Sequence, residues 1–116
     1  EEALTWCEKA IARNKLNPCF YYLRATILQE HRQEEAAINS LKQALYLDPN
    51  FVLAYFAMGN LVRQQGRAKE ALKNFQNVRS LLKNYAPEDV LPESDGMTAG
   101  RLEAIITTML VTEERV

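Results

Sequence analysis

The sequence of 116 residues has little of what most catalytic and metal sites require, with one histidine, two cysteines and four glycines. A single imidazole, His31, leaves almost no material for a zinc site or a histidine-based catalytic triad. Cys7 and Cys19 are too few for a disulfide scaffold and lack CxxC spacing. The glycines form neither a P-loop nor a dinucleotide fingerprint. We therefore expect no enzymatic activity, no cofactor and no metal in this stretch.

The sequence also has no large excess of positive or negative charge and no long apolar run. Lys and Arg number 14 against 15 Asp and Glu, so the basic excess typical of proteins that bind nucleic acid or anionic membranes is absent. No window approaches the roughly 18 apolar residues of a membrane span, and no secretory signal is visible. The sequence thus favours a cytoplasmic protein partner over nucleic acid or membrane. The start at Glu1 resembles the middle of a helix, which predicts a longer parent chain.

What the sequence does contain is an internal repeat. Ala3, Ala37 and Ala71 are separated by steps of 34 residues, and residue size is kept at neighbouring positions. The other related sets are Leu4, Ile38 and Leu72; Cys7, Leu41 and Phe75; Ala10, Ala44 and Val78; Tyr21 and Tyr55; Ala25 and Gly59; and Leu28 and Val62. A fixed period of this size is typical of solenoids, in which each unit buries its apolar face against the next.

Each unit is predicted to contain two amphipathic helices. In the last unit the two apolar faces consist of Tyr55, Met58, Gly59 and Val62, and of Ala71, Leu72, Phe75 and Val78. Both sets follow helical spacing. Gly66 lies between them and permits the first helix to end. Asn17 followed by Pro18 predicts a capped helix start, and residues 48–50 form the equivalent turn between units.

These residues resemble the tetratricopeptide pattern, in which an aromatic, an apolar–small pair and Ala-x3-aromatic recur every 34 residues. The resemblance implies an all-α, TPR-type alpha-alpha superhelix, a helix-turn-helix solenoid with a half repeat at 1–16 and full repeats at 18–50 and 52–84. The first full repeat departs from the pattern at Arg24, where the family prefers leucine, and at Arg32, where it prefers glycine. These departures leave its inner packing and its turn open.

A narrower resemblance rests on residues 44–56, on Gly59-Asn60-Leu61, and on the segment 91–102, which reads LPESDGMTAGRL. These segments resemble the C-terminal tetratricopeptide region of CheR-type chemotaxis methyltransferases. In that family an upstream domain uses S-adenosylmethionine to methylate receptor glutamates. The resemblance implies that the present chain is an attached interaction module and that the parent chain is the methyltransferase.

The sequence changes character after the last repeat. Residues 85–97 combine prolines, a glycine and four acids, which predicts an acidic loop. Residues 98–116 are predicted to form an amphipathic capping helix. Its apolar stripe consists of Leu102, Ile105, Ile106, Met109 and Leu110. This stripe either covers the open end of the solenoid or docks on another protein or a second copy of the chain.

The family resemblance also implies where a partner binds, because the first helix of each unit lines the concave face. The candidate binding residues are Tyr22, Thr26, Gln29, Phe56, Asn60, Arg63 and Gln64. Tyr22 and Phe56 are one repeat apart and are expected to be neighbours. Aromatic rings beside amide and guanidinium groups suit a peptide partner. The alternative is that neighbouring helices of the same chain cover the aromatics. The carboxylate clamp of chaperone-binding relatives is matched only at Asn60, which argues against a chaperone C-terminus as partner.

Charge is uneven along the chain. Residues 61–84 contain six bases and one acid, whereas residues 88–95 contain four acids and no base. The basic stretch is either a solvated helix face, partly neutralised by the acidic loop, or a patch for an acidic partner. Three functions stay open. The chain captures a protein or peptide partner, or it assembles through the half repeat and the last helix, or it is a tetratricopeptide scaffold unrelated to chemotaxis.

Overall fold

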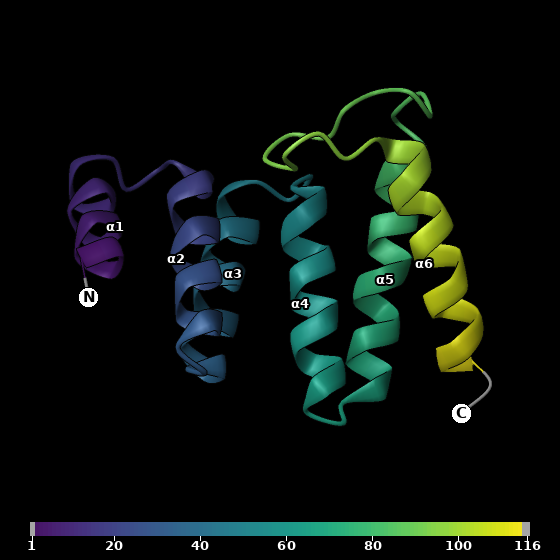
Figure 1. The fold of residues 1–116 in the computed structure, drawn as a ribbon, viewed down its shortest axis with the longest axis horizontal. Coiled ribbons are helices and arrows are strands. Elements are labelled where there is room, and N and C mark those ends of the chain that lie inside the picture. The colour runs from purple at the N-terminus through teal and green to yellow at the C-terminus, as the bar shows by residue number, and fades with distance from the viewer. Residues whose placement is uncertain (1, 115–116) are drawn as a thin grey trace.

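Six α-helices follow one another along residues 2–114, the part of the chain that this computed structural model describes; side chains are described as far as Val111. The helices are α1 (Glu2–Arg13), α2 (Pro18–Glu30), α3 (Glu34–Leu47), α4 (Val52–Gln64), α5 (Ala68–Leu82) and α6 (Ala99–Glu114). Figure 1 shows them in a row that follows the order of the chain. The prediction of an all-α fold is confirmed. The last two residues of the predicted helix 98–116, and Glu1 of the half repeat, lie outside the described residues.

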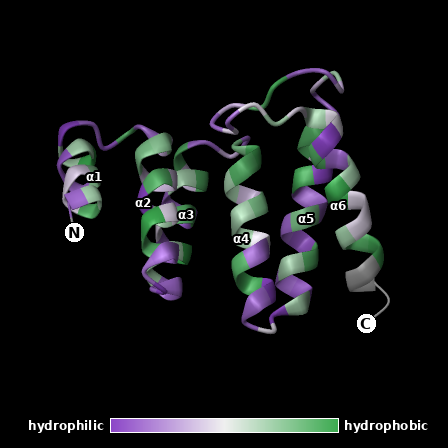
Figure 2. Ribbon diagram, viewed as in Figure 1, coloured by the Kyte–Doolittle hydropathy of each residue, from purple (hydrophilic) through white to green (hydrophobic). Residues whose placement is uncertain are grey.

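The packing of the helices follows the 34-residue period. Helix α2 packs against α3 and α4 against α5, while α1 packs against α2, α3 against α4, and α5 against α6. Ala37 and Ala71, which the repeat relates, are both fully buried, whereas the equivalent Ala3 of α1 is exposed. Figure 2 shows hydrophilic residues around the α4–α5 turn and along much of α5. None of the described helices is both long and apolar enough to cross a membrane.

Helix α4 approaches α5 closely at Gly59. A methyl carbon added to Gly59 would lie 2.5 Å from Cε1 of Phe75 and 2.8 Å from its Cδ1. Carbon atoms in contact normally lie about 3.5–4.0 Å apart, so only glycine fits against this ring. One unit earlier, Ala25 takes the position of Gly59 and Leu41 takes the position of Phe75. The residue on the first helix is larger there, and the corresponding residue on the second helix is smaller.

The turns between paired helices use a left-handed residue. Gly66 has φ +78° after α4, and Arg32, its equivalent after α2, has φ +61°. Glycine takes this conformation freely, whereas a residue with a Cβ takes it at a cost. The departure at Arg32 therefore leaves the geometry of the turn unchanged. At the start of α2, the Asn17 side chain accepts a hydrogen bond from the Cys19 backbone N–H at 2.9 Å, the cap that the sequence predicts.

The departure at Arg24 has a definite structural role. Its guanidinium donates from Nε to Ser40 Oγ at 2.9 Å, from Nη1 to Glu8 Oε1 at 2.9 Å, and from Nη2 to Gln43 Oε1 at 2.6 Å. Ser40 is buried on α3 and Glu8 lies on α1, so one side chain connects three helices. The guanidinium also lies over the ring of Tyr21, 5.2 Å from its centroid. A polar junction thus replaces the apolar contact that leucine provides in the family pattern.

Helix α6 closes the end of the solenoid. Leu102, Ile106 and Leu110 of the predicted stripe are buried, and α6 packs against α5. The Thr98 side chain accepts from the Arg101 backbone N–H at 3.2 Å and caps the start of the helix. Gly100 lies so close to Pro87 that an added methyl carbon would be 3.0 Å from the Pro87 carbonyl oxygen. Ile105 and Met109 of the stripe are half-buried, so three of its five residues are buried where α6 covers α5. Docking of the helix on another protein or a second copy stays a prediction.

Candidate partner-binding groove

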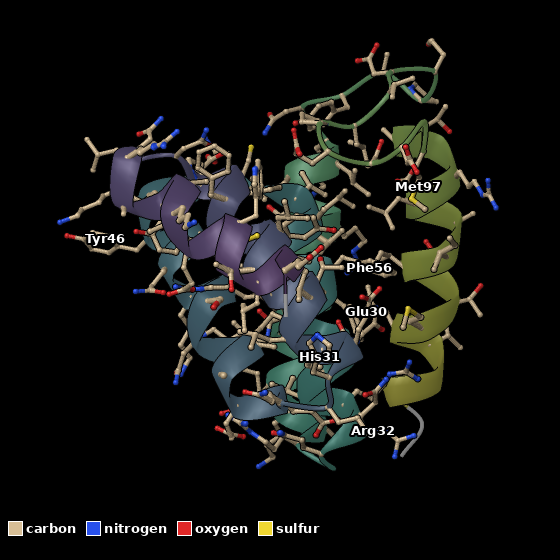
Figure 3. The ribbon with its side chains drawn as sticks, turned by 60° about the vertical axis from the view of Figure 1, so that its left-hand side comes forward. Glu30, His31, Arg32, Tyr46, Phe56 and Met97 are labelled. Carbon is tan, nitrogen blue, oxygen red and sulfur yellow. The ribbon has the colours of Figure 1, made fainter. Side chains whose placement is uncertain are left out.

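A groove of about 670 Å³ runs between α2, α4 and the loop that precedes α6. Its lining residues are Cys19, Phe20, Tyr22, Leu23 and Thr26 from α2, Leu53 and Phe56 from α4, and Glu93, Ser94, Asp95 and Met97 from the loop. Figure 3 shows Phe56 and Met97 on one side of the molecule and Tyr46 on the other.

The repeat explains why two separate helices line one groove. Cys19, Tyr22 and Thr26 are spaced by three and four residues and lie on one face of α2. Leu53 and Phe56 of α4 follow Cys19 and Tyr22 at one period. Stacking of the units then aligns the two faces, as the sequence predicts for a pair such as Tyr22 and Phe56. Both of these aromatics line the groove.

Each of the two aromatics packs against a second ring behind it. The Tyr22 ring lies 5.1 Å from that of Phe51, and the Phe56 ring lies 6.2 Å from that of Phe75, measured between centroids. Tyr22 and Phe56 are half-buried, while Phe51 and Phe75 belong to the core. The groove therefore has an aromatic floor that is supported by the core and that the chain's own helices cover only in part.

Of the remaining predicted binding residues, Thr26 lines the groove and the other four do not. Thr26 lines the groove and donates its hydroxyl to the Tyr22 carbonyl at 3.2 Å. Gln29, Asn60, Arg63 and Gln64 lie nearer the C-terminal ends of α2 and α4 and are not among the lining residues. Arg63 donates to Asn60 Oδ1 at 3.4 Å, so these two polar groups contact each other. Gln29 and Gln64 are exposed.

The loop contributes groove residues that the sequence does not predict as binding residues. Its base is closed by backbone hydrogen bonds, from Leu91 N to Met97 O at 2.9 Å and from Ala99 N to Asp89 O at 2.8 Å. Inside this closed segment, Ser94 Oγ accepts from Met97 N at 3.1 Å, and Leu91 is buried in the core. In Figure 1 the loop reaches back from the end of α5 over the end of α4 before it returns to α6.

The groove carries negative charge. Glu93 and Asp95 are exposed at its edge, and its lining includes no Lys, Arg or His. Within the described residues neither carboxylate forms an ion pair, and none joins the loop acids to the bases of α5. The cation of Arg67, the residue just before α5, pairs instead with Glu70 in the first turn of that helix. Whether the basic stretch is a solvated helix face or a patch for an acidic partner stays a prediction.

Two titratable groups inside the groove stay neutral near pH 7. Burial and, to a smaller degree, the charge of Glu93 raise the pKa of the Tyr22 hydroxyl. Burial and the Glu93 carboxylate likewise raise the pKa of the Cys19 thiol. Both shifts favour the protonated form. The carboxylates of Glu93 and Asp95 therefore supply the charge of the groove.

Glu35 and Asp48 are two carboxylates that could suggest acid–base catalysis, but each is engaged in a separate hydrogen bond. Glu35 accepts a hydrogen bond from Gln65 Nε2 at 3.0 Å, and Asp48 accepts one from the Asn50 backbone N–H at 3.0 Å within its turn. Over the described part of the chain, no group of three or more His, Cys, Asp or Glu side chains is placed to hold a metal ion.

A second exposed surface lies at the α1 end of the solenoid. Trp6 of α1 is 56% exposed, and Leu16, in the turn after α1, is 77% exposed. The Trp6 ring meets that of Phe20 edge-on at 6.0 Å. A hollow beside these rings is lined by Trp6, Lys9, Ala10, Arg13, Asn14 and Phe20.

Comparison with known sequences places a tetratricopeptide repeat in this chain. A family model described as TPR repeat matches residues 33–66, which include α3 and α4. A curated relative is the small glutamine-rich tetratricopeptide repeat-containing protein 2 of Mycosarcoma maydis, 35% identical over 68 residues. The match covers 59% of the present chain and 19% of that protein, so the chain corresponds to about a fifth of its relative's length.

Solved structures show the same fold. The type III secretion chaperone SycD of Yersinia enterocolitica, in complex with a peptide of the translocator YopD, has a TM-score of 0.79 at 15% identity. That likeness covers 97% of the present chain and 78% of SycD. PcrH, in complex with the chaperone-binding region of PopD, has a TM-score of 0.80 at 16% identity, covering 98% of this chain and 77% of PcrH. The TPR-type superhelix with repeated helix pairs is therefore confirmed.

Proposed function

We propose that this chain is a protein-interaction module that holds a peptide segment of a partner in the groove between α2 and α4. The observation that carries this proposal is the aromatic floor formed by Tyr22 and Phe56, half-buried and supported from behind by core rings. Aromatic side chains fixed in this way provide contact area at low entropic cost, which is typical of binding hot spots. The solved complexes of SycD and PcrH with peptides of their partners show that chains of this fold can serve such a purpose.

The narrower part of the proposal concerns the parent chain. The resemblance of residues 91–102 to CheR-type methyltransferases supports a chemotaxis context, with this module attached to an S-adenosylmethionine-dependent enzyme in the cytoplasm. In that arrangement the module binds a partner protein, and neither nucleic acid nor membrane, and delivers or regulates the methyltransferase. Detectable binding of S-adenosylmethionine to the 116-residue chain itself would contradict the proposal that this module binds the partner while another domain carries out methylation.

The peptide proposal can be tested with a displayed library of random 12-residue peptides selected against the immobilised chain. Selected peptides are then synthesised with a fluorescent label, and their affinities for variants are measured by fluorescence anisotropy. Phe56→Ala removes part of the groove floor and is expected to weaken binding at least about tenfold. Tyr46→Ala is the matched control, because Tyr46 is an aromatic that is 86% exposed on the opposite side.

A second substitution separates binding from folding. Phe56 contacts Phe75 of the core, so its removal also affects stability. Thr26 is exposed on the groove side of α2, and Thr26→Arg places a long side chain in the groove without removing core contacts. Equal affinity of the wild-type chain and both groove variants would overturn the proposal.

Self-association is the second candidate function, and the exposed Trp6 and Leu16 at the first end of the solenoid favour it. A partially exposed tryptophan beside a second ring resembles an incomplete interface. Sedimentation velocity over a wide concentration range distinguishes the two functions. Concentration-dependent dimers that Trp6→Ser abolishes, together with unchanged peptide affinity in Phe56→Ala, support assembly over peptide capture.

A further inference from the structure

The floor and the edge of the groove between α2 and α4 differ in chemistry. The floor is apolar and aromatic, with Leu53 and Phe56 from α4 and Tyr22 from α2. The edge on the loop side carries the carboxylates of Glu93 and Asp95. A second hollow, which shares Cys19 and Glu93 with the groove, includes Asp48 and no base. The negative charge therefore extends along the loop side of the groove.

No cation of the chain balances this charge within the described residues. Arg24, a base on α2, is already bound to Ser40, Glu8 and Gln43. Arg63 lies at the far end of α4 and contacts Asn60. An acidic ligand would be repelled at this edge, and a neutral one would leave both carboxylates without a counter-charge.

We propose that the groove selects peptides in which a lysine or arginine lies next to a large apolar residue, with the apolar side chain on the aromatic floor and the cation against Glu93 and Asp95. This inference rests on the proposed function, because it names the class of peptide that the groove binds. Long cationic side chains suit the position because their methylene stems pack on apolar surface while the charged end stays in water.

The loop holds the two carboxylates in place. Glu93 and Asp95 have φ of +60° and +59°, and Gly96 has φ of +95°. Between them the Ser94 hydroxyl donates to the Leu91 carbonyl at 2.5 Å and accepts from Met97 N at 3.1 Å. Because the base of the loop is closed by backbone hydrogen bonds, the two acids are displayed from a defined turn, and less conformational freedom is lost on binding.

The expected preference is moderate, because Glu93 and Asp95 are exposed. Ion pairs of this kind contribute little individually, so two of them together correspond to about three- to tenfold in affinity at low salt. Salt screens such pairs strongly, since the Debye length falls from about 10 Å at 0.1 M to about 3 Å at 1 M. The preference for basic peptides is therefore expected to shrink as salt is added, whereas the apolar contribution persists.

The test uses 12-residue synthetic peptide pools with a central phenylalanine or leucine, an adjacent residue fixed as lysine, arginine, glutamine or glutamate, and other positions randomised. Anisotropy titrations compare the wild-type chain with the double substitution Glu93→Gln and Asp95→Asn. Glu88→Gln is the matched control, because Glu88 is an exposed acid near the start of the same loop and does not line the groove. Basic pools are expected to bind about three- to tenfold more tightly than the glutamine pool, and only the double variant should lose this preference.

The outcomes separate the two proposals. Equal binding of basic, neutral and acidic pools, with the loss in Phe56→Ala preserved, overturns the preference for cations and leaves peptide capture intact. A preference for basic pools that survives in the double variant overturns the assignment to these two acids. If no pool binds the wild-type chain more tightly than it binds Phe56→Ala, peptide capture itself fails, and the inference fails with it.

Discussion

The contact between Gly59 and Phe75 allows a quantitative test of how the repeats pack. In the substitution Gly59→Ala the new methyl carbon would be 2.5, 2.8 and 2.9 Å from three carbons of the Phe75 ring. Phe75 is fully buried and lies against Phe56, so the ring has little room to withdraw. Overpacking of this kind costs about 1–3 kcal/mol. Alanine in place of a glycine inside a helix raises the free energy of unfolding by about 1 kcal/mol through helix propensity. With three short contacts the strain is expected near the upper limit, which gives a net loss of about 2 kcal/mol in the free energy of unfolding.

The effect of Gly59→Ala on stability is expected to change sign when the Phe75 ring is removed. Phe75→Leu alone is expected to cost about 1–2 kcal/mol, because it deletes buried carbons. In that background Gly59→Ala no longer meets a ring, so only the helix-propensity gain of about 1 kcal/mol remains. The double variant then has the Ala and Leu pair that Ala25 and Leu41 form one repeat earlier. A coupling free energy of about 2–3 kcal/mol is thus expected between the two positions.

Urea denaturation followed by circular dichroism at 222 nm measures the four free energies of unfolding. Equal m-values across the set are needed, because solenoid units can unfold separately. Ala25→Gly serves as the control and is expected to lose about 2 kcal/mol, about 1 through helix propensity and about 0.8 through deletion of a buried methyl group. A Gly59→Ala cost that is the same with and without the Phe75 ring would refute steric contact as the reason for glycine at this position.

Three further results follow from the structure. Arg32→Gly is expected to raise the free energy of unfolding by about 1 kcal/mol in the same denaturation assay, because Arg32 has φ +61°; a loss of stability would contradict this. Arg24→Leu introduces the leucine of the family pattern and is expected to lower the free energy of unfolding by about 1–3 kcal/mol, because the buried Ser40 hydroxyl loses its partner. Adding Ser40→Ala to that variant should recover part of the lost stability. Burial raises the pKa of both thiols, so iodoacetamide should alkylate Cys19 at pH 8 more slowly than in the urea-unfolded chain, and the fully buried Cys7 more slowly still. Mass spectrometry of the peptides measures these rates, and equal rates in the folded and unfolded chains would contradict the assigned burial.

Much of the fold was predictable because it depends on short-range periodicity. The spacing of Tyr55, Gly59 and Val62 defines a helix face, and the 34-residue step then determines which helices stack. The Asn17 cap and the turn glycine at Gly66 are local signals of the same kind. Such features are encoded within a few residues of each other, so a single sequence reveals them.

Departures from the pattern were harder to interpret. Leucine is expected at the position of Arg24, and the sequence does not reveal that Glu8, Ser40 and Gln43 from two other helices converge on the guanidinium. Each of those partners is unremarkable in its own helix. Their convergence depends on the packing of α1 and α3 against α2, which the sequence pattern predicts only in outline.

The candidate site likewise combines residues that the periodic pattern predicts with residues that it does not. Tyr22, Thr26 and Phe56 were predictable as groove residues because they recur on the first helices of the units. Gln29, Asn60, Arg63 and Gln64 lie on the same helices but do not line the groove, whose remaining lining comes from the loop where it crosses. That crossing depends on hydrogen bonds between residues 91 and 97 and between 89 and 99, which no periodic pattern encodes.

The loop therefore bears on how a repeat fold can acquire a specific partner. The two helix faces that line the groove are repeated, with Leu53 and Phe56 related by the period to Cys19 and Tyr22, so the repeats alone provide a general apolar surface. The charges at its edge come from Glu93 and Asp95, which lie outside every repeat. Loops tolerate sequence change more readily than stacked helices, because fewer core contacts depend on them. In the proposed function the helices supply affinity and the loop supplies selectivity. The amide substitutions Glu93→Gln and Asp95→Asn, which keep a Cβ at both left-handed positions, should then change which peptides bind while leaving the free energy of unfolding within about 0.5 kcal/mol of the wild-type value.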